Sequence, residues 1–409
     1  MARGTNMKLI SAAVLGLFSG YAAASGFQLL EQNASGIGNA YAGSAAVADN
    51  ASTIFYNPAG MTQLQAREFS AGVTAVQTKF DFKNSGSTNP FAAPGTPANG
   101  PDGNGGTLGV IPNGYMSWAL SKDLYVGVGV GAPFGLKTEY DNNWKGRYQS
   151  QSFDIKTYNI NPSIAYRVND KVSLGFGLNI QRFEAEYIRQ ATPAAKVTLT
   201  ANDTAYGWNA GALFTLSDAT KVGVSYRSQI KYDLKGDLKG AVNSPAKADL
   251  TLPDTFILSV TQKLSDRWEM LGDVSWTGWS SIPKLDIMYN SGASKETLDT
   301  QFKDTWRVAL GTNYKYNDAM TFKFGIAYDK SPVPNAEHRL ASLPDNDRTW
   351  LSTGLQWKPN KTSALDVGVA YLFVKDTEIN HNGGAGKGLV KGSYDSSGIL
   401  LGVQYSMAF

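Results

Sequence analysis

The sequence predicts an all-β protein: a fourteen-stranded antiparallel transmembrane β-barrel with a small N-terminal helical hatch inside its lumen. Three observations lead to this fold class. Apolar and polar residues alternate with a period of two through most of the 409 residues, which is the period of a strand with two unlike faces. Short turns alternate along the chain with long loops, as in outer-membrane barrels. Only 17% of residues are charged and the mean hydropathy is −0.24, as expected when every second strand residue faces lipid.

The N-terminal segment has the features of a secretory signal peptide. Lys8 supplies a positive charge, residues 9–21 form a short apolar stretch, and Ala22-Ala23-Ala24 fits the small-residue rule for cleavage. We therefore expect residues 1–24 to be removed and the mature chain to begin near Ser25. No stretch of about 20 apolar residues recurs later in the sequence, which argues against a helical membrane protein.

Residues 25–66 differ in composition from the rest of the chain and are predicted to form the hatch. They are rich in Ala, Gly, Ser and Asn, and they lack the long alternation of the later segments. Small residues of this kind suit a compact plug of short helices and turns. The alternative interpretation is a disordered N-terminal tail.

Residues 67–409 are predicted to form the barrel. In residues 172–181, for example, Val, Leu, Phe, Leu and Ile alternate with Ser, Gly, Gly, Asn and Gln. The fourteen segments predicted as strands are 67–83, 108–121, 123–140, 151–167, 171–187, 206–217, 220–236, 251–264, 267–289, 301–316, 320–330, 347–358, 363–377 and 391–409. The longest predicted loop is 84–106, and short turns of one or two residues fall on the opposite side, as at Asn169-Asp170.

Aromatic residues gather near the predicted strand ends, where the belts of membrane barrels meet the lipid–water interface. These residues are Trp118, Tyr125, Trp268, Trp276, Trp279, Trp306, Tyr314, Tyr316 and Trp350. The chain also ends on an alternating strand with the aromatic Phe409. A soluble β-sandwich would alternate as well, but the number of uninterrupted hairpins and the aromatic strand ends argue against it. We therefore expect a multi-pass β-barrel in a bacterial outer membrane.

Several motifs resemble the FadL family of outer-membrane transporters for long-chain fatty acids and other hydrophobic compounds. The N-terminal motifs are Gly26-Phe27-Gln28-Leu29, the run SGIGNAYAG at 35–43, and the hatch motif Asn57-Pro58-Ala59. The later motifs are Phe302-Lys303-Asp304, SPVP at 331–334, PDNDR at 344–348 and the closing strand. The resemblance covers the whole mature chain.

The resemblance implies a hatch-plugged barrel that takes up long-chain fatty acids by passive diffusion. A ligand would be caught at extracellular loops, pass to a lumenal pocket that touches the hatch, and leave sideways through a kink in the third strand. The matching lateral gate here consists of Gly131, Ala132, Pro133, Phe134 and Gly135, since Pro cannot donate to a sheet ladder. The alternative is that Pro133 only ends a strand.

The resemblance also implies four ligand-binding residues. Phe27 and Leu29 would form the hatch face of an apolar pocket for the tail, and Arg189 and Lys303 would bind the carboxylate. Each of these two cations could instead be an ordinary solvated charge near a loop. Other lumen-facing charges are expected to form polar networks that hold the hatch, because charges inside barrels are usually paired; they are Asp273, Arg307, Asp329 and Asp366.

In one respect the sequence departs from the best-known family members. Its loops at 188–205 and 237–250 are short, whereas in those proteins they carry a helical, apolar capture site. The first loop is mildly apolar but does not have the pattern of a strong amphipathic helix. The sequence therefore gives no clear candidate for an initial low-affinity site.

Other function classes fit the sequence less well. There is no Cys, and the two histidines, His338 and His381, lie in polar loops, so we predict no enzyme activity, no metal site and no cofactor. The balance of 37 basic and 34 acidic residues gives no electrostatic case for nucleic acid. A general diffusion porin would lack a hatch. The alternative that keeps the fold is an uptake channel for aromatic hydrocarbons or other hydrophobic xenobiotics, which needs no lumenal cation. Besides its ligand, we expect contact with outer-membrane lipid, and a monomer.

Overall fold

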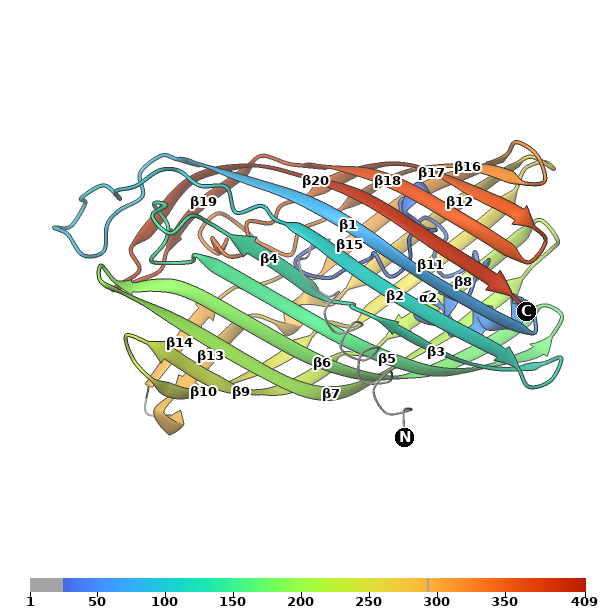
Figure 1. Ribbon diagram of the computed structural model, residues 1–409, viewed down its shortest axis with the longest axis horizontal. Coiled ribbons are helices and arrows are strands. Elements are labelled where there is room, and N and C mark those ends of the chain that lie inside the picture. Colours follow the sequence, from blue (N-terminus) through green and yellow to red (C-terminus); the bar gives the residue numbers. More distant parts are fainter. Residues whose placement is uncertain (1–24, 293) are drawn as a thin grey trace, which may run out of the picture.

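The computed structural model describes residues 25–292 and 294–409, which form one closed antiparallel sheet around a small hatch (Figure 1). The barrel closes because β1 (Arg67–Asn84) pairs with β2 (Leu108–Ala119) on one side and with β20 (Leu389–Ala408) on the other. Twenty strand segments make fourteen wall strands, since six wall strands consist of two consecutive segments each. This confirms the predicted fold class. The predicted signal peptide lies outside the described residues.

The remaining segments complete the wall in chain order. The unbroken wall strands are β1, β2, β20, β5 (Ser152–Asn169), β6 (Val172–Thr192), β7 (Ala195–Thr215), β16 (Met320–Asp329) and β17 (Arg348–Asn360). The interrupted ones are β3 (Leu124–Gly131) with β4 (Gly135–Glu139), β8 (Thr220–Arg227) with β9 (Ile230–Gly240), β10 (Ser244–Leu252) with β11 (Thr255–Lys263), β12 (Trp268–Thr277) with β13 (Lys284–Tyr289), β14 (Ser294–Asp299) with β15 (Thr305–Lys315), and β18 (Ser363–Val374) with β19 (Thr377–Asn382).

Two hairpins extend further than the sequence indicates. The region 188–205, predicted as a loop, is strand on both sides of a two-residue turn at Pro193 and Ala194, and 237–250 likewise belongs mostly to β9 and β10. The reason is that the period of two continues there, with mainly Thr and Asn in the outward positions of the first region and Asp and Lys in those of the second. Neither region contains a helix.

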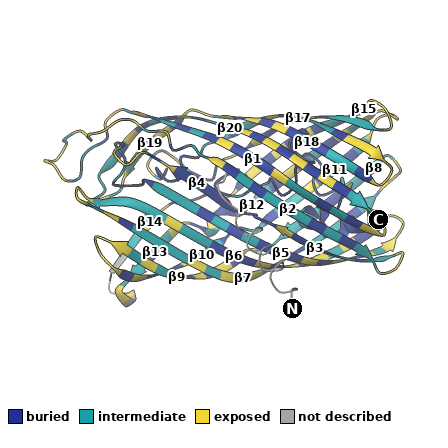
Figure 2. Ribbon diagram, in the orientation of Figure 1, coloured by how far each residue is buried: buried dark blue, intermediate teal, exposed yellow. Residues whose placement is uncertain are grey.

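The outer surface of the barrel changes character along its axis. On β6, Leu174, Phe176, Leu178 and Ile180 are exposed. They alternate with less exposed residues that face the lumen, Gly175, Gly177 and Asn179, in the banded pattern that Figure 2 shows. Further toward the long loops the outward positions of the same strand hold an exposed ion pair between Arg182 and Glu184. The apolar band suits lipid, and the charged zone beyond it suits the aqueous side.

Three of the aromatic residues assigned to the interface belts lie in the lumen instead. Trp279 and Trp350 have no exposed surface, and Tyr125 is buried. Trp350 alternates with the outward-facing Leu351, which is 58% exposed, so its place near a strand end does not decide which face it occupies. Trp279 lies in a short helical turn, η3 (Trp279–Ser281), that interrupts the strand period.

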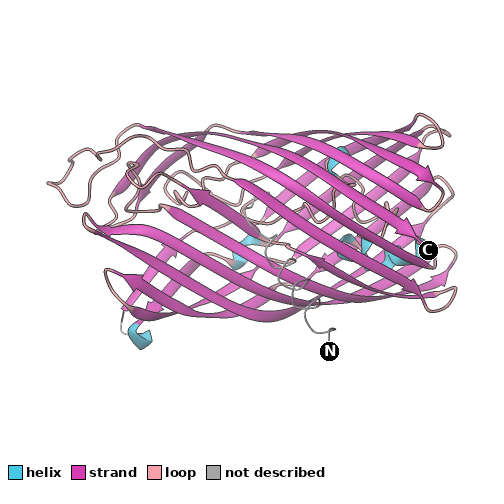
Figure 3. Ribbon diagram, viewed as in Figure 1, coloured by secondary structure: helices cyan, strands magenta, loops and turns pink. Residues whose placement is uncertain are grey.

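Residues 25–66, the segment predicted as the hatch, lie inside the barrel (Figure 3), and most of them are buried. This segment contains three short helices, η1 (Ile37–Asn39), α2 (Thr53–Tyr56) and η2 (Pro58–Gln63). The remaining short helical turn, η4 (Asn290–Gly292), belongs to the wall, between β13 and β14. Ala40 and Tyr41 follow η1 with positive φ angles, which ends that helix after one turn. No described helix is long and apolar enough to cross a membrane.

Candidate ligand-binding site

The motif Asn57-Pro58-Ala59 fixes the hatch to the barrel wall. Asn57 caps η2, because its side-chain oxygen accepts a hydrogen bond from the Ala59 N–H at 3.1 Å. The amide of Asn57 also donates to the Ala212 carbonyl of β7 at 2.9 Å. Pro58 takes the first helical position, where a missing N–H costs no bond. Ala59 lies against Gly175 of β6, where a Cβ would be 2.2 Å from the Ala59 nitrogen.

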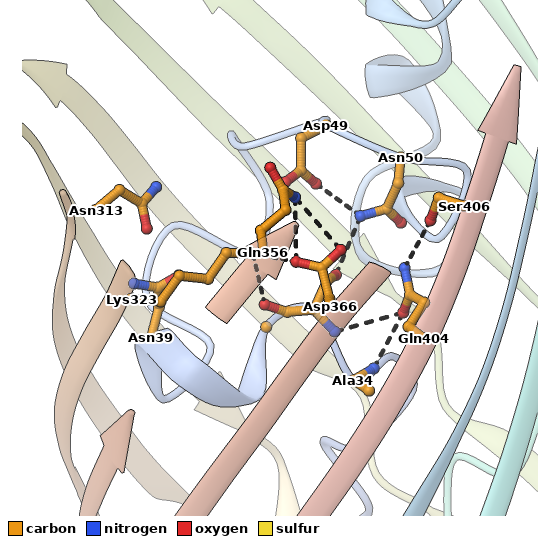
Figure 4. A network of polar contacts seen from close by, with 12 residues as sticks. Ala34, Asn39, Asp49, Asn50, Asn313, Lys323, Gln356, Asp366, Gln404 and Ser406 are labelled. Carbon is orange, nitrogen blue, oxygen red and sulfur yellow. Dashed lines mark hydrogen bonds and ion pairs between the residues drawn. The ribbon is translucent and has the colours of Figure 1, made fainter. Parts of the chain in front are cut away.

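A buried ion pair connects the hatch to the other side of the wall (Figure 4). The Lys323 ammonium of β16 donates to Asp366 of β18 at 2.8 Å and to the Ser35 carbonyl of the hatch at 3.0 Å. On β20, the side-chain oxygen of Gln404 accepts the Ala34 N–H at 3.1 Å. The two charged side chains are 6% and 2% exposed, and their pairing offsets the cost of burying them.

The other predicted lumenal charges also contact the hatch, as expected from the sequence. All of them are buried. The contacts are Arg307 Nη2 to the Ala40 carbonyl at 2.6 Å, Ser44 Oγ to Asp273 at 2.8 Å, and the Ser25 N–H to Asp329 at 3.2 Å. Polar side chains from several wall strands thus hold a hatch that has little regular structure of its own.

The third wall strand breaks at the predicted position. β3 ends at Gly131 and β4 begins at Gly135, with three residues between them in no strand. β2 pairs with β3 only as far as Gly114 opposite Val130, and β4 pairs with β5 alone. The backbone ladder between residues 108–113 of β2 and the third wall strand is therefore interrupted.

The first hatch residues replace the hydrogen bonds that the sheet loses at this break. The Leu29 N–H donates to the Pro133 carbonyl at 2.8 Å, and the Gly135 N–H donates to the Phe27 carbonyl at 2.8 Å. The hatch and the kink thus form a short antiparallel pairing centred on Gln28. The two segments cannot move apart without leaving buried backbone groups unpaired.

Gln32 adds a second connection between the hatch and the kink. Its side-chain amide donates to the Ala132 carbonyl at 2.7 Å, and its oxygen accepts the Ala132 N–H at 3.1 Å. A side chain at Gly131 would collide with this amide, because a Cβ there would lie 2.5 Å from Gln32 Oε1. Phe134 is held from the wall side, where its N–H donates to Thr157 Oγ1 at 2.9 Å.

An apolar cavity, here called the upper cavity, lies in the lumen on the long-loop side of the hatch. The free space in it is about 910 Å³, its open mouth included. Phe27 of the hatch contributes to it, together with mostly aliphatic and aromatic residues of β5, β6, β7, β9, β10, β13 and β14; among them are Phe153, Ile155, Phe183, Leu234, Leu250 and Ile287. Such a cavity suits an aliphatic chain or an aromatic ring.

Four aromatic rings pack together at the hatch end of this cavity. Phe27 lies edge-on to Trp279 with ring centres 5.0 Å apart and is 6.0 Å from Phe134 of the kink, while Phe302 is 6.0 Å from Trp279. Gly26 permits this packing: its φ is +62°, and a Cβ there would lie 2.7 Å from the Trp279 ring. This group of four rings, here called the aromatic floor, joins hatch, kink and wall, and Phe27 and Phe302 are its members that line the cavity.

A second cavity, the lower cavity, lies beyond this floor and has mixed character. Its free space is about 820 Å³, and it is lined by Leu29, by Pro133 and Phe134 of the kink, and by polar residues that include Arg227 and Asp273. Of the predicted pocket residues on the hatch, Phe27 thus faces the upper cavity and Leu29 the lower one.

Arg189 lies near the mouth of the upper cavity, although it is not among the residues that line it. It stands two residues beyond Tyr187, which does line the cavity, and its guanidinium is 3.5 Å from the Glu296 carboxylate. Glu296 also pairs with Lys387. The side chains of Arg189, Glu296 and Lys387 are only 17%, 18% and 13% exposed.

Lys303 lies elsewhere. Its side chain is exposed, its backbone N–H donates to the Pro332 carbonyl at 3.0 Å, and it does not line either cavity. The neighbouring Phe302 packs against Trp279, whereas Lys303 has no contact with this group of rings among the described interactions. The structure therefore does not bring the two predicted cations together.

Sequence reasoning missed three parts of the site. No local sequence pattern indicates the role of Gln32, because its partner Ala132 is 100 residues away in the chain. Trp279 was assigned to the lipid interface, although the preceding Gly278 marks a break in the strand pattern. The pair Glu296 and Lys387 is 91 residues apart, and only the glycine-rich surroundings of Lys387 at 383–388 indicated a special turn.

Comparison with known proteins relates this arrangement to one family. The family described as outer membrane protein transport protein (OMPP1/FadL/TodX) matches residues 15–409. The chain is 31% identical to a long-chain fatty acid transport protein of Escherichia coli O6:H1 (strain CFT073), with 97% of each chain covered.

Solved structures show the same fold. A Pseudomonas aeruginosa FadL homologue superimposes with a TM-score of 0.84 at 24% identity, covering 94% of this chain and 99% of the other. The toluene transporter TbuX of Ralstonia pickettii gives a TM-score of 0.71 at 15% identity, covering 93% and 100%.

Proposed function

Because the chain belongs to the outer membrane protein transport protein family (OMPP1/FadL/TodX), we propose that it takes up long-chain fatty acids by passive diffusion. Members of the family are transport proteins of the outer membrane and not enzymes. The chain is accordingly an outer-membrane transporter of hydrophobic compounds. The choice of fatty acids among these compounds is our proposal.

One observation carries the choice of a fatty acid: a cluster of two cations and one carboxylate, Arg189, Lys387 and Glu296, stands at the mouth of an apolar cavity. Arg189 follows Tyr187 on the same face of β6, since alternate residues of a strand point the same way. A fatty acid could place its tail among residues such as Phe183 and Leu250 and its carboxylate near Arg189. Curated relatives named as long-chain fatty acid transport proteins support this assignment.

We propose that the ligand leaves through the wall at the kink. Three features support this route. The ladder beside β2 is interrupted between Gly131 and Gly135, and the lower cavity reaches Pro133 and Phe134. The outward positions of β2 nearest the break hold the partly exposed Val110 and Pro112 and carry no charge. A movement of Phe27 that carries its backbone as well as its ring would open the aromatic floor between the two cavities and release the hydrogen bond that its carbonyl accepts from the Gly135 N–H.

A second candidate cargo is an aromatic hydrocarbon. The observation that favours it is the apolar lining of the upper cavity, in which Arg189 itself takes no part. A hydrocarbon needs no counter-charge, so it would bind in the same place without the cluster at the mouth.

Mass spectrometry of ligands extracted from the purified barrel separates the two candidates. The protein is purified from an outer membrane in a detergent without an acyl chain, and the extract is compared with that of an unrelated barrel handled in parallel. We expect long-chain fatty acids to be enriched in the extract. Enrichment of neutral aromatic compounds without fatty acids would contradict the proposal.

A further inference from the structure

The mouth of the upper cavity contains a carboxylate of the protein itself. Glu296 lies on β14, two residues from Leu298, which lines the cavity, and Arg189 lies two residues from Tyr187 on β6. Because the side-chain period of a strand is two, both residues continue the cavity-facing rows toward the extracellular end. They meet there at 3.5 Å.

Lys387 reaches the same carboxylate from a third element. It belongs to the loop between β19 and β20, in which Gly384, Gly386 and Gly388 have φ angles of +80°, +75° and +68°. Such angles suit glycine, and the turn is closed by the Gly388 N–H, which donates to the Gly384 carbonyl at 3.0 Å. The Lys387 ammonium donates to Glu296 Oε1.

The Glu296 carboxylate is the chemical equivalent of a fatty acid head group. It accepts from Lys387 and Arg189, and it is also 3.5 Å from the Tyr289 hydroxyl. All of these charged groups are mostly shielded from water, and a shielded charge needs a partner. Glu296 therefore provides the negative charge that these cations require.

We propose that Glu296 is an internal competitor that lowers the affinity of the cavity for anionic ligands, and that Lys387 is the second head-group cation beside Arg189. The inference rests on the proposed uptake of fatty acids and extends it by assigning residues that set the preference between charged and neutral ligands. A ligand carboxylate arriving at the mouth must share Arg189 and Lys387 with Glu296 or displace it. A neutral ligand with the same tail meets no such competition.

The test compares oleic acid with oleyl alcohol, which has the same tail and no charge, on the full-length purified barrel. Glu296→Gln keeps the shape of the side chain and removes its charge. We expect this variant to bind oleate about tenfold more tightly, the scale of one hydrogen bond to a charged group, and oleyl alcohol within about twofold of wild type. Lys387→Gln should weaken oleate binding about tenfold and leave the alcohol unchanged.

The matched control is Glu184→Gln, which removes a carboxylate from the outer face of β6 where it pairs with Arg182. It should change neither affinity. Unchanged oleate binding by Glu296→Gln, or equal changes for oleate and the alcohol, would overturn the inference, the second result indicating only a structural role. Failure of the proposed function has a different signature: the wild-type barrel would bind the alcohol but not oleate, which would overturn both.

Discussion

Arg189 and Lys303 carry the same charge, but the structure gives them different surroundings. Arg189 is mostly shielded at the mouth of the upper cavity beside Glu296, and Lys303 is exposed and lines neither cavity. Charge–charge interactions are much stronger where water is excluded. The two residues are therefore a natural pair of test and control.

We predict that Arg189→Ala weakens oleate binding by roughly tenfold or more, the scale of a lost charge-assisted hydrogen bond, and leaves toluene binding unchanged. Lys303→Ala should alter neither. Equilibrium binding of both ligands to the purified barrel measures this. Equal losses of affinity for oleate and toluene in Arg189→Ala would contradict a role of Arg189 in binding the ligand carboxylate.

Glu31 is a further residue whose surroundings determine its behaviour. It belongs to the hatch, next to Gln32, and has no exposed surface. Neither carboxylate oxygen has a hydrogen bond to another described residue. Burial raises the pKa of Glu31 from 4.5 to about 7, although Arg348 and Arg307 act in the opposite direction.

Because its pKa is raised, Glu31 keeps its proton between about pH 4.5 and 7 while the hatch is seated in the barrel, whereas in a hatch released into water it would lose that proton. The stability of the seated hatch is therefore greatest below about pH 4.5 and falls as the pH rises toward 7. We predict faster hydrogen exchange of the hatch amides at pH 8 than at pH 5, after correction for intrinsic rates. Glu31→Gln should remove most of this difference. A pH dependence identical in the variant would disprove the role of Glu31.

At the scale of elements, residues 25–32 of the hatch and the break in the third wall strand act as one unit. The backbone hydrogen bonds between Leu29 and Pro133 and between Gly135 and Phe27 pair N–H and carbonyl groups that have no partner within their own element. Phe27 also forms part of the floor of the upper cavity. A ligand that displaced Phe27 would therefore disturb the backbone of the kink directly.

The strands could be predicted from sequence because their signal is local, but the site could not be predicted in full. Alternation located all fourteen wall strands, and Pro133 between two glycines located the break. The faces of Trp279 and Trp350 were assigned wrongly, because a position near a strand end does not specify lumen or lipid. The contacts of Gln32 with Ala132 and of Glu296 with Lys387 join distant segments, and no local pattern indicates such a pairing.

At the scale of the whole molecule, the break in the third wall strand lies at a defined level relative to the lipid band. Gly131 pairs with Asn159 and Gly135 with Lys156 on β5. The outward residue nearest this level on the membrane side is Ile160, which is 48% exposed. The break therefore lies where the outer surface changes from apolar to charged, at the edge of the lipid band that faces the long loops.

The hatch lies in the lumen below this level, and the effect of its removal can be predicted. We predict that deletion of residues 26–66 turns the barrel into a pore for small hydrophilic solutes, because the wall behind the hatch is lined by polar side chains such as Gln404 and Asp366. Single-channel conductance in planar bilayers measures the change. Conductance equal to that of the intact protein would contradict the role of these residues as a plug.

The most direct test of the lateral route is uptake of radiolabelled oleate by whole cells after the kink has been straightened. Ala132, Pro133 and Phe134 are replaced by Val-Thr-Val, and a control carries Val-Thr in place of Ser228 and Gln229, at the break between β8 and β9. We predict that the first variant inserts into the outer membrane as a folded barrel and loses uptake to background, while the control transports normally. Wild-type uptake through the straightened wall would contradict lateral exit.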